Sequence, residues 1–293
     1  MEQKLARLKV LLLDRLSEQG VVETGVPGVS IFRRDEAYKQ RSQLYAAQII
    51  LLAQGRKDIY WGNRRFVYDP GHYYVQTVPL PVVCEAIVEN EEPILGLIIQ
   101  LDPQVIREML SNLESLPPPQ DNSVVSLYSA STTETILDAA LRLLECLGSR
   151  NETKVLGQVF LKELLFRVLC GEKGEALREL ALSQRGVSQV TQAIHKIHEE
   201  YAKPLDIPSM AREAGMSTTA FYSVFKSVTS TSPLQYIKNI RLHKAKELIQ
   251  QEGEKAYEAA LRVGYESASQ FSREYKRCFG TPPAKDRLPV PLH

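Results

Sequence analysis

The chain is poor in the residues that build metal centres and disulfide frameworks. Its 293 residues include four cysteines, which are far apart and form no CxxC pair, and five histidines. This usage argues against a zinc cluster or a disulfide framework and is typical of a reducing compartment, so we expect a cytoplasmic protein. The first 186 residues contain one histidine, His72. A metal site needs several ligands at one point, so we expect neither a metal nor another cofactor.

Long apolar runs and an excess of one charge are also absent. The longest apolar run, Ile94–Ile99, is far shorter than the roughly 20 residues of a membrane helix. The segment Met1–Asp14 mixes basic residues into its apolar pattern and predicts an amphipathic helix rather than a signal peptide. The 36 basic residues nearly balance the 35 acidic residues, so any surface for a polyanion must be local.

The sequence from Gly25 to Leu101 favours β-structure. Short runs rich in Val, Ile, Tyr and Phe alternate with turn residues, which is typical of hairpins in a sandwich or barrel. One hairpin is expected from Asp58–Trp61 and Arg64–Tyr68, which flank Gly62-Asn63. Glycine at the first turn position suits a type II′ turn.

After Asp102-Pro103, apolar residues recur at the three- and four-residue spacing of an α-helix. Asp102 is expected to cap a helix that begins at Pro103, and the prolines of segment 116–123 prevent its continuation. Two further helices are expected over Thr133–Leu147 and Thr153–Cys170. Their leucine-rich stripes predict core packing or a dimer interface. We therefore divide the chain into an N-terminal helical segment 1–24, a domain 25–171, a linker 172–186 and a helical domain 187–293.

The C-terminal domain contains an internal duplication. Ala211–Met216, Ser217–Phe221 and Pro233 recur as Ala260–Tyr265, Ser267–Phe271 and Pro283, offset by 49 or 50 residues. Each copy predicts a short helix, a glycine turn, a serine cap and a second helix, which is a helix-turn-helix motif. The domain holds 15 basic and 11 acidic residues, so a polyanion is the expected partner.

The second helix of each copy has an apolar face and a polar face. An exposed polar helix face fits the major groove of DNA and presents side chains to base edges. Pro233–Gln251 is expected to form a connecting helix of about 27 Å, at ~1.5 Å per residue. That length approaches the ~34 Å between successive major grooves on one side of DNA. The two motifs therefore suit adjacent grooves.

The run Ala260–Arg287 resembles the AraC/XylS family of bacterial transcription regulators, and about 100 residues match in order. Pro282 and Asp286 depart from the family pattern, but they lie beyond the reading helix. A looser resemblance to an AraC-type regulatory domain covers roughly residues 25–170. Gln54–Lys57, Tyr68–Gly71 and Pro79–Pro81 are among the residues that carry it.

This resemblance implies a fold of mixed α and β structure in several domains. A cupin-like β-barrel with flanking helices would form the regulatory and dimerisation domain. An all-α domain with two helix-turn-helix motifs joined by a long helix would bind DNA. By family position, six residues would contact bases, and three basic residues are better assigned to phosphates. The base contacts are Thr219, Tyr222, Ser223, Ser269, Ser272 and Arg273, and the phosphate contacts are Lys226, Lys276 and Arg277.

The barrel is expected to bind a small molecule. Its candidate ligand or sensor residues are Cys84, Tyr60, Tyr74 and His72. Core packing is the plainer interpretation of most aromatic residues in this region, and a buried cysteine is usually inert. Electrophile sensing by Cys84 or Cys146 is a further hypothesis. It requires exposure and a lowered thiol pKa.

Together these features predict a homodimeric transcription regulator that binds promoter DNA, contacts RNA polymerase and responds to an unknown effector. Two alternatives stay open: a regulator without a ligand, whose barrel serves dimerisation alone, and a cupin-type enzyme fused to a DNA-binding domain. The enzyme is disfavoured because the sequence contains no GxSxG, HExxH or P-loop motif and no metal-binding triad. We expect no catalytic residues and no association with membranes, and a place on the nucleoid when the protein is bound to DNA.

Overall fold

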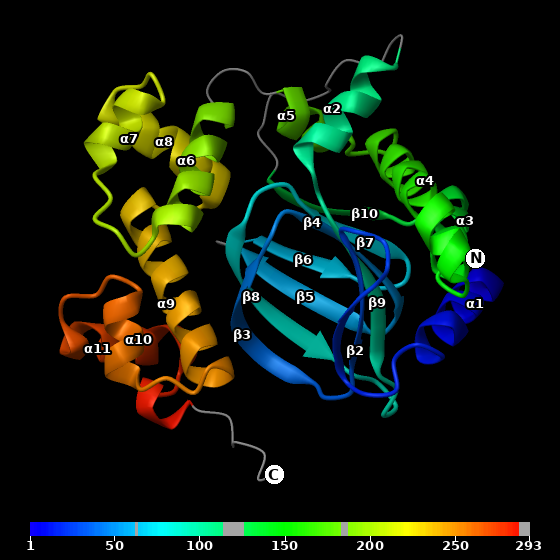
Figure 1. The fold of residues 1–293 in the computed structure, drawn as a ribbon, viewed down its shortest axis with the longest axis horizontal. Helices are drawn as coiled ribbons and strands as arrows, with labels where there is room; N and C mark the ends of the chain where they lie inside the picture. The colour runs from blue at the N-terminus through cyan, green and yellow to red at the C-terminus, as the bar shows by residue number, and fades with distance from the viewer. Residues whose placement is uncertain (62–63, 114–125, 183–186, 287–293) are drawn as a thin grey trace. The chain divides into compact units, whose positions relative to one another are not determined.

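A computed structural model describes residues 1–61, 64–113, 126–182 and 187–286 (Figure 1). The chain divides into two compact units, of which the first contains most of residues 1–183 and the second contains 184–293. Each unit has a core of its own, so they are described separately.

The first unit is built on two antiparallel sheets. The six-stranded sheet has the order β1-β2-β9-β4-β7-β10, and the four-stranded sheet has the order β3-β8-β5-β6. This confirms the cupin-like β-domain, although the strands form two sheets rather than one closed barrel. The strands are β1 Gly20–Glu23, β2 Val29–Arg34, β3 Tyr38–Tyr45, β4 Gln48–Gln54, β5 Arg56–Trp61, β6 Arg64–Tyr68, β7 His72–Gln76, β8 Leu80–Ile87, β9 Ile94–Gln100 and β10 Leu127–Ser131.

Helices cover one face of the six-stranded sheet (Figure 1). Leu97 of β9 lies opposite Ile31 of β2 and Leu51 of β4, and all three residues belong to the core beneath these helices. Ile50 and Leu52 alternate with the core residues of β4 and are also buried, so both faces of this strand are covered. The helices are α1 Glu2–Leu13, α2 Pro103–Ser111, α3 Glu134–Cys146, α4 Arg150–Leu169 and α5 Glu175–Leu182.

Several local expectations are confirmed in this unit. Trp61 pairs with Arg64 in the β5–β6 hairpin, and Asp102 accepts a hydrogen bond from the Gln104 N–H at the start of α2. The turn residues 62–63 and the proline segment fall outside the described residues. The stretch 172–186, expected to be a linker, contains α5, whose Ala176 and Leu177 are buried in the first core. The predicted domain boundaries stay a prediction.

Residues 187–286, which form most of the second unit, are built from helices. As predicted, α9 connects the two motifs and spans Pro233–Gln251. Ser217 caps α8 by accepting the Ala220 N–H, and Ser267 caps α11 by accepting the Gln270 N–H. The helices are α6 Val187–Glu200, α7 Ile207–Glu213, α8 Thr218–Thr229, α9, α10 Ala256–Arg262 and α11 Ala268–Phe279, followed by the short 3-10 helix η1 Pro283–Lys285.

The turns of the two motifs need glycine for different reasons. Gly215 and Gly264 both have positive φ, at 64° and 86°, a conformation that side chains disfavour. A Cβ atom on Gly264 would lie 2.4 Å from the carbonyl oxygen of Ala202, whereas one on Gly215 would meet only Gln189 Nε2, at 3.7 Å. The second turn is therefore also constrained by close backbone packing.

We expect Gly264→Ala to destabilise the protein more than Gly215→Ala. Alanine costs about 1 kcal/mol at either position because of its left-handed backbone. Only Gly264→Ala adds a steric clash with a backbone carbonyl, so we expect this variant to lose about 3 kcal/mol of unfolding free energy in total. Urea unfolding of both variants measures the difference. Equal losses would contradict the close packing at Gly264.

Candidate nucleic-acid interface

Helices α8 and α11 expose corresponding positions to solvent. Phe221 and Phe225 of α8 are buried, and so are their counterparts Phe271 and Tyr275 of α11. The residue that follows each of these aromatic positions is exposed in both helices. Each helix therefore anchors one aromatic face in its own motif and presents a continuous polar face.

The nine predicted DNA contacts all lie on these polar faces. Every one of them is exposed, including Tyr222, which is 38% exposed despite its aromatic ring. Side chains that read bases must project from the helix in this way, because base edges are reached from within the groove. Which of them contacts a base or a phosphate stays a prediction. The nine are Thr219, Tyr222, Ser223, Lys226, Ser269, Ser272, Arg273, Lys276 and Arg277.

Glu274 breaks the likeness between the two helices and anchors α11. It occupies the position of Val224 in α8. Its carboxylate accepts hydrogen bonds from Lys238 Nζ on α9 at 2.8 Å and from the Tyr265 hydroxyl at 2.8 Å. Burial opposes the charge, but these hydrogen bonds lower the pKa of Glu274. The replacement of an apolar residue by an acid in the second repeat is a signal that our sequence analysis missed.

Arg241 joins the second motif to the segment that precedes the first. It lies on α9, and its guanidinium donates to the carbonyl oxygens of Tyr201 at 2.7 Å, Lys203 at 3.0 Å and Gly264 at 3.0 Å. A planar guanidinium with five N–H groups suits three acceptors at once. This side chain therefore helps to set the relative orientation of the two reading helices. Nothing in the sequence distinguishes Arg241 from an arginine on the surface of a helix, so this role could not be predicted from the sequence.

His195 and His198, three residues apart on α6, do not form a common site. His195 is exposed, whereas His198 Nε2 lies 2.8 Å from the hydroxyl of Tyr236 on α9. Burial lowers the pKa of His198 to about 4, so the ring is neutral at physiological pH. His195 is therefore solvated, whereas His198 packs against α9. In the part of the chain that the structure describes, no group of three or more metal-ligating side chains forms a candidate metal site.

Cys84 lies in the interior of the β-domain among tyrosines. The hydroxyls of Tyr38 and Tyr45 donate to its Sγ at 3.3 and 3.4 Å. Tyr74 contacts the ring of Tyr45 edge-on and stacks on Tyr68. The structure therefore brings together two of the predicted sensor residues, Cys84 and Tyr74.

The other two sensor candidates lie elsewhere. Tyr60 is partly exposed and donates to a carboxylate oxygen of Glu85, and His72 is exposed beside Asp69. Cys146 is buried in α3, and burial raises the pKa of its thiol. Neither Cys84 nor Cys146 has the exposure that a reactive cysteine needs, so the electrophile hypothesis gains no support.

Lys57 is a buried cation that sequence reasoning missed. It is 6% exposed, and its Nζ lies 4.6 Å from the centre of the Phe32 ring. Burial lowers its pKa to about 8, because desolvation disfavours the ammonium form. Side chains alternate between the two faces of strand β5, and Lys57 lies on the inward face. From sequence, a lysine in a strand with several polar residues is ordinarily assigned to the surface.

A β-domain joined to two helix-turn-helix motifs with matching exposed faces defines a DNA-binding transcription regulator. A family model for the N-terminus of AraC-type transcriptional regulators matches residues 25–176, and a helix-turn-helix domain model matches residues 210–288. The chain belongs to the AraC-type transcriptional regulators. In the described residues, no helix has the length and hydrophobicity required to span a membrane.

Sequence relatives and solved structures agree with this assignment. The virulence regulon transcriptional activator VirF of Yersinia enterocolitica is 27% identical over 247 residues, which cover 82% of this chain and 88% of VirF. The apo structure of a ToxT variant from Vibrio cholerae matches with a TM-score of 0.61 at 9% identity, over 90% of this chain and 98% of ToxT. Wild-type ToxT with a bound unsaturated fatty acid matches with a TM-score of 0.57 at 12% identity, over 87% of this chain and 92% of ToxT. At these identities, the ToxT structures establish a common fold.

We expect Arg241→Met to loosen the arrangement of the two motifs. Loss of three charge-assisted hydrogen bonds should lower the free energy of unfolding by about 2–3 kcal/mol. It should also weaken binding to DNA with two half-sites more than binding to a single half-site. Fluorescence anisotropy with both DNA fragments, together with urea unfolding, tests these effects.

Lys244→Met, on the same helix, is the matched control. Lys244 forms a surface ion pair with Glu247, which contributes at most about 1 kcal/mol. If Arg241→Met weakens binding to one and two half-sites by the same factor, Arg241 does not set the relative orientation of the motifs.

Proposed function

We propose that this protein is a cytoplasmic, homodimeric regulator that binds promoter DNA, contacts RNA polymerase and is controlled by a small-molecule effector. The observation that carries this proposal is the matching exposed face of α8 and α11, with nine side chains suited to bases and phosphates. We propose transcriptional activation because VirF, similar over most of its length, is named an activator. No catalytic role is proposed.

Within this interface, Thr219, Tyr222 and Ser223 of α8 would contact the bases of one half-site. Ser269, Ser272 and Arg273 of α11 would contact the bases of the next. Lys226, Lys276 and Arg277 would bind phosphates and account for part of the salt dependence of binding. Arg273 is the strongest candidate for specificity, because a guanidinium donates two parallel hydrogen bonds to guanine. The α9 helix of 19 residues spans about 28 Å, which supports binding in adjacent major grooves.

Arg273→Ala should abolish sequence preference rather than all DNA binding. Loss of a bidentate base contact costs about 1–3 kcal/mol, so affinity for the operator should fall roughly 5- to 150-fold. Sequencing of genomic fragments bound to the purified protein measures this. The wild type should enrich a motif of two half-sites about one helical turn apart, and Arg273→Ala should not.

Lys276→Ala, on the same helix, separates base contacts from phosphate contacts. It should weaken binding to all sequences alike and lower the salt slope by about 1. Arg107→Ala removes a cation from the first unit and should change neither property. An equal loss on every sequence from Arg273→Ala would contradict base reading by Arg273.

Helix α4 supports the proposal of a homodimer. Its apolar residues surround the helix, and Leu161, Leu164 and Leu165 on one side are buried in the first core. On the other side Val155 is 71% exposed, Leu156 is 36% exposed and Val159 is 57% exposed. The predicted stripe is therefore core in its C-terminal part and exposed in its N-terminal part. A second copy of the chain would cover this exposed patch.

The double substitution Val155→Glu/Val159→Glu should dissociate the dimer. Burying carboxylates in an apolar interface costs several kcal/mol, so the dissociation constant should rise about 100-fold or more. Analytical ultracentrifugation measures the change. Val21→Glu, which introduces charge at an exposed valine of β1, is the control. If the dimer of the double variant is as stable as that of the wild type, this face of α4 is not the dimer interface.

Control by an effector is supported by the interior and by a fold neighbour. The interior of the β-domain holds polar groups, Lys57 and the phenols around Cys84, in an otherwise apolar core. ToxT, which shares the fold, has been crystallised with an unsaturated fatty acid. We propose effector control on these grounds.

A further inference from the structure

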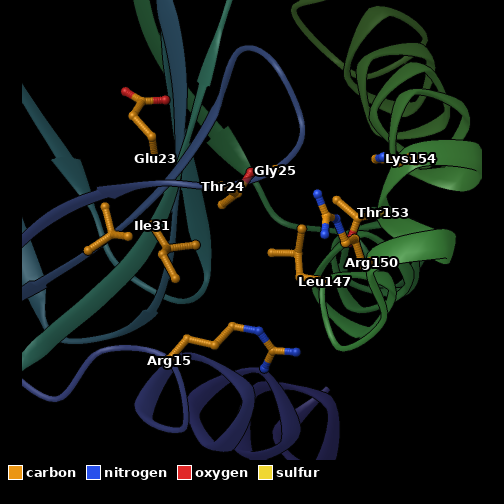
Figure 2. A pocket seen from close by; sticks show the side chains of 10 residues that line it. Arg15, Glu23, Thr24, Gly25, Ile31, Leu147, Arg150, Thr153 and Lys154 are labelled. Atoms are coloured by element: carbon orange, nitrogen blue, oxygen red, sulfur yellow. The ribbon is translucent and has the colours of Figure 1, made fainter.

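A cavity of about 470 Å³ opens in the first unit beneath helix α4 (Figure 2). Its walls come from β1, β2 and the loop between them, from the segment just after α1, and from the start of α4 with the turn before it. The apolar part is formed by Val22, Ile31 and Leu147, and the polar part contains Arg15, Arg150 and Lys154. The volume lies within the roughly 300–1,000 Å³ of pockets for small molecules.

The cations of this cavity have no counter-ions among the described residues. None of Arg15, Arg150 and Lys154 lies within ion-pair distance of a carboxylate in the part of the chain that the structure describes. Arg15 Nη1 donates to the carbonyl oxygen of Leu11 at 2.8 Å, which holds this guanidinium in place. Glu23 also borders the cavity, but Figure 2 shows its carboxylate turned away from Arg15 and Arg150. The cavity is therefore positively charged.

The start of α4 borders the cavity, and its first turn carries one acid, Glu152, beside the basic residues. Arg150, Thr153 and Lys154 belong to its first turn or lie next to it, and Ser149 caps the helix by accepting the Glu152 N–H. The N–H groups of a first helical turn have no intrahelical acceptor, and the helix dipole favours an anion there. The Thr153 hydroxyl is engaged with the carbonyl oxygens of Cys146 and Ser149, so the basic side chains are the groups left to bind an anion.

The walls of the cavity are held together by close packing. A Cβ on Gly25 would lie 2.8 Å from Thr153 Cγ2, and a Cβ on Gly157 would lie 2.4 Å from a methyl group of Val26. Gln158 Nε2 also donates to the carbonyl oxygen of Pro27 at 3.2 Å. The loop between β1 and β2 is therefore packed closely against α4.

We propose that this cavity is an effector site for a small organic anion with an apolar body. A carboxylate or phosphate head would lie between the guanidinium groups of Arg15 and Arg150, which form strong paired hydrogen bonds with such groups. The apolar body would pack on Val22, Ile31 and Leu147. The inference rests on the proposed effector control and gives it a location and a ligand class.

The site has a direct route to the dimer interface. Thr153 and Lys154 border the cavity, and Val155 and Val159 of the same helix form the proposed dimer patch. A ligand that bridges Arg15 and Arg150 ties the start of α4 to α1. Under this proposal, ligand binding would change dimer affinity, and by linkage dimerisation would change ligand affinity by the same factor.

Three fluorescent probes test the site on the full-length protein. 2-Naphthoate and 2-naphthyl phosphate carry the two possible heads, and 2-naphthamide is a neutral analogue of similar size. Anisotropy titrations should show that at least one anion binds about tenfold or more tightly than the amide. The tighter anion identifies the head group. Arg15→Met and Arg150→Met should each weaken its binding about tenfold or more, whereas Arg107→Met, at an exposed arginine outside the cavity, should not.

The outcomes that overturn the site are distinct from failure of the proposed function. Equal affinity for anion and amide, no binding of either anion at millimolar concentration, or unchanged binding after both arginine substitutions would each refute it. Circular dichroism confirms folding, and Arg15→Lys, which keeps the charge, should retain more binding than Arg15→Met. DNA binding is measured on the same samples without probe, so a failed effector site and failed DNA recognition give separate results.

Discussion

The contact between the second turn and the chain segment before the first motif fixes how the two helix-turn-helix motifs are arranged. Gly264 approaches the Ala202 carbonyl so closely that no side chain fits between them, and Arg241 hydrogen-bonds the carbonyls on both sides. Rigid spacing matters for the proposed binding mode, in which the two helices enter successive grooves together. A flexible connection would lose affinity to the entropy of ordering the two motifs. The spacing of the duplicated motifs thus depends on a few backbone contacts away from their exposed faces.

Helix α4 has a comparable position in the first unit. One face belongs to the core, another exposes valines, and its first turn borders a positively charged cavity. An apolar stripe in a sequence cannot distinguish these environments, because core and interface select the same residues. The helix therefore connects the proposed effector site to the proposed dimer interface.

Prediction from sequence succeeded where the signal was local or repeated. The serine caps, the glycine turns and the bounds of α9 followed from short-range backbone chemistry, and the duplication provided two independent readings of one pattern. It failed where a residue acts through distant partners. Glu274, Arg241 and His198 each bind groups from other segments, and only folding brings those groups together. Lys57 was missed because its burial depends on the packing of the two sheets.

The sequence by itself determined the class of the protein, the pair of helix-turn-helix motifs and the residues exposed on their reading faces. These properties follow from periodicity and from capping, which depend on neighbours within a few residues. Tertiary structure alone decided which thiols are buried, which cations are gathered at one place and where a cavity forms. Those properties depend on the distances between segments far apart in the chain. Burial and electrostatic interaction act through space, so a linear pattern does not contain them.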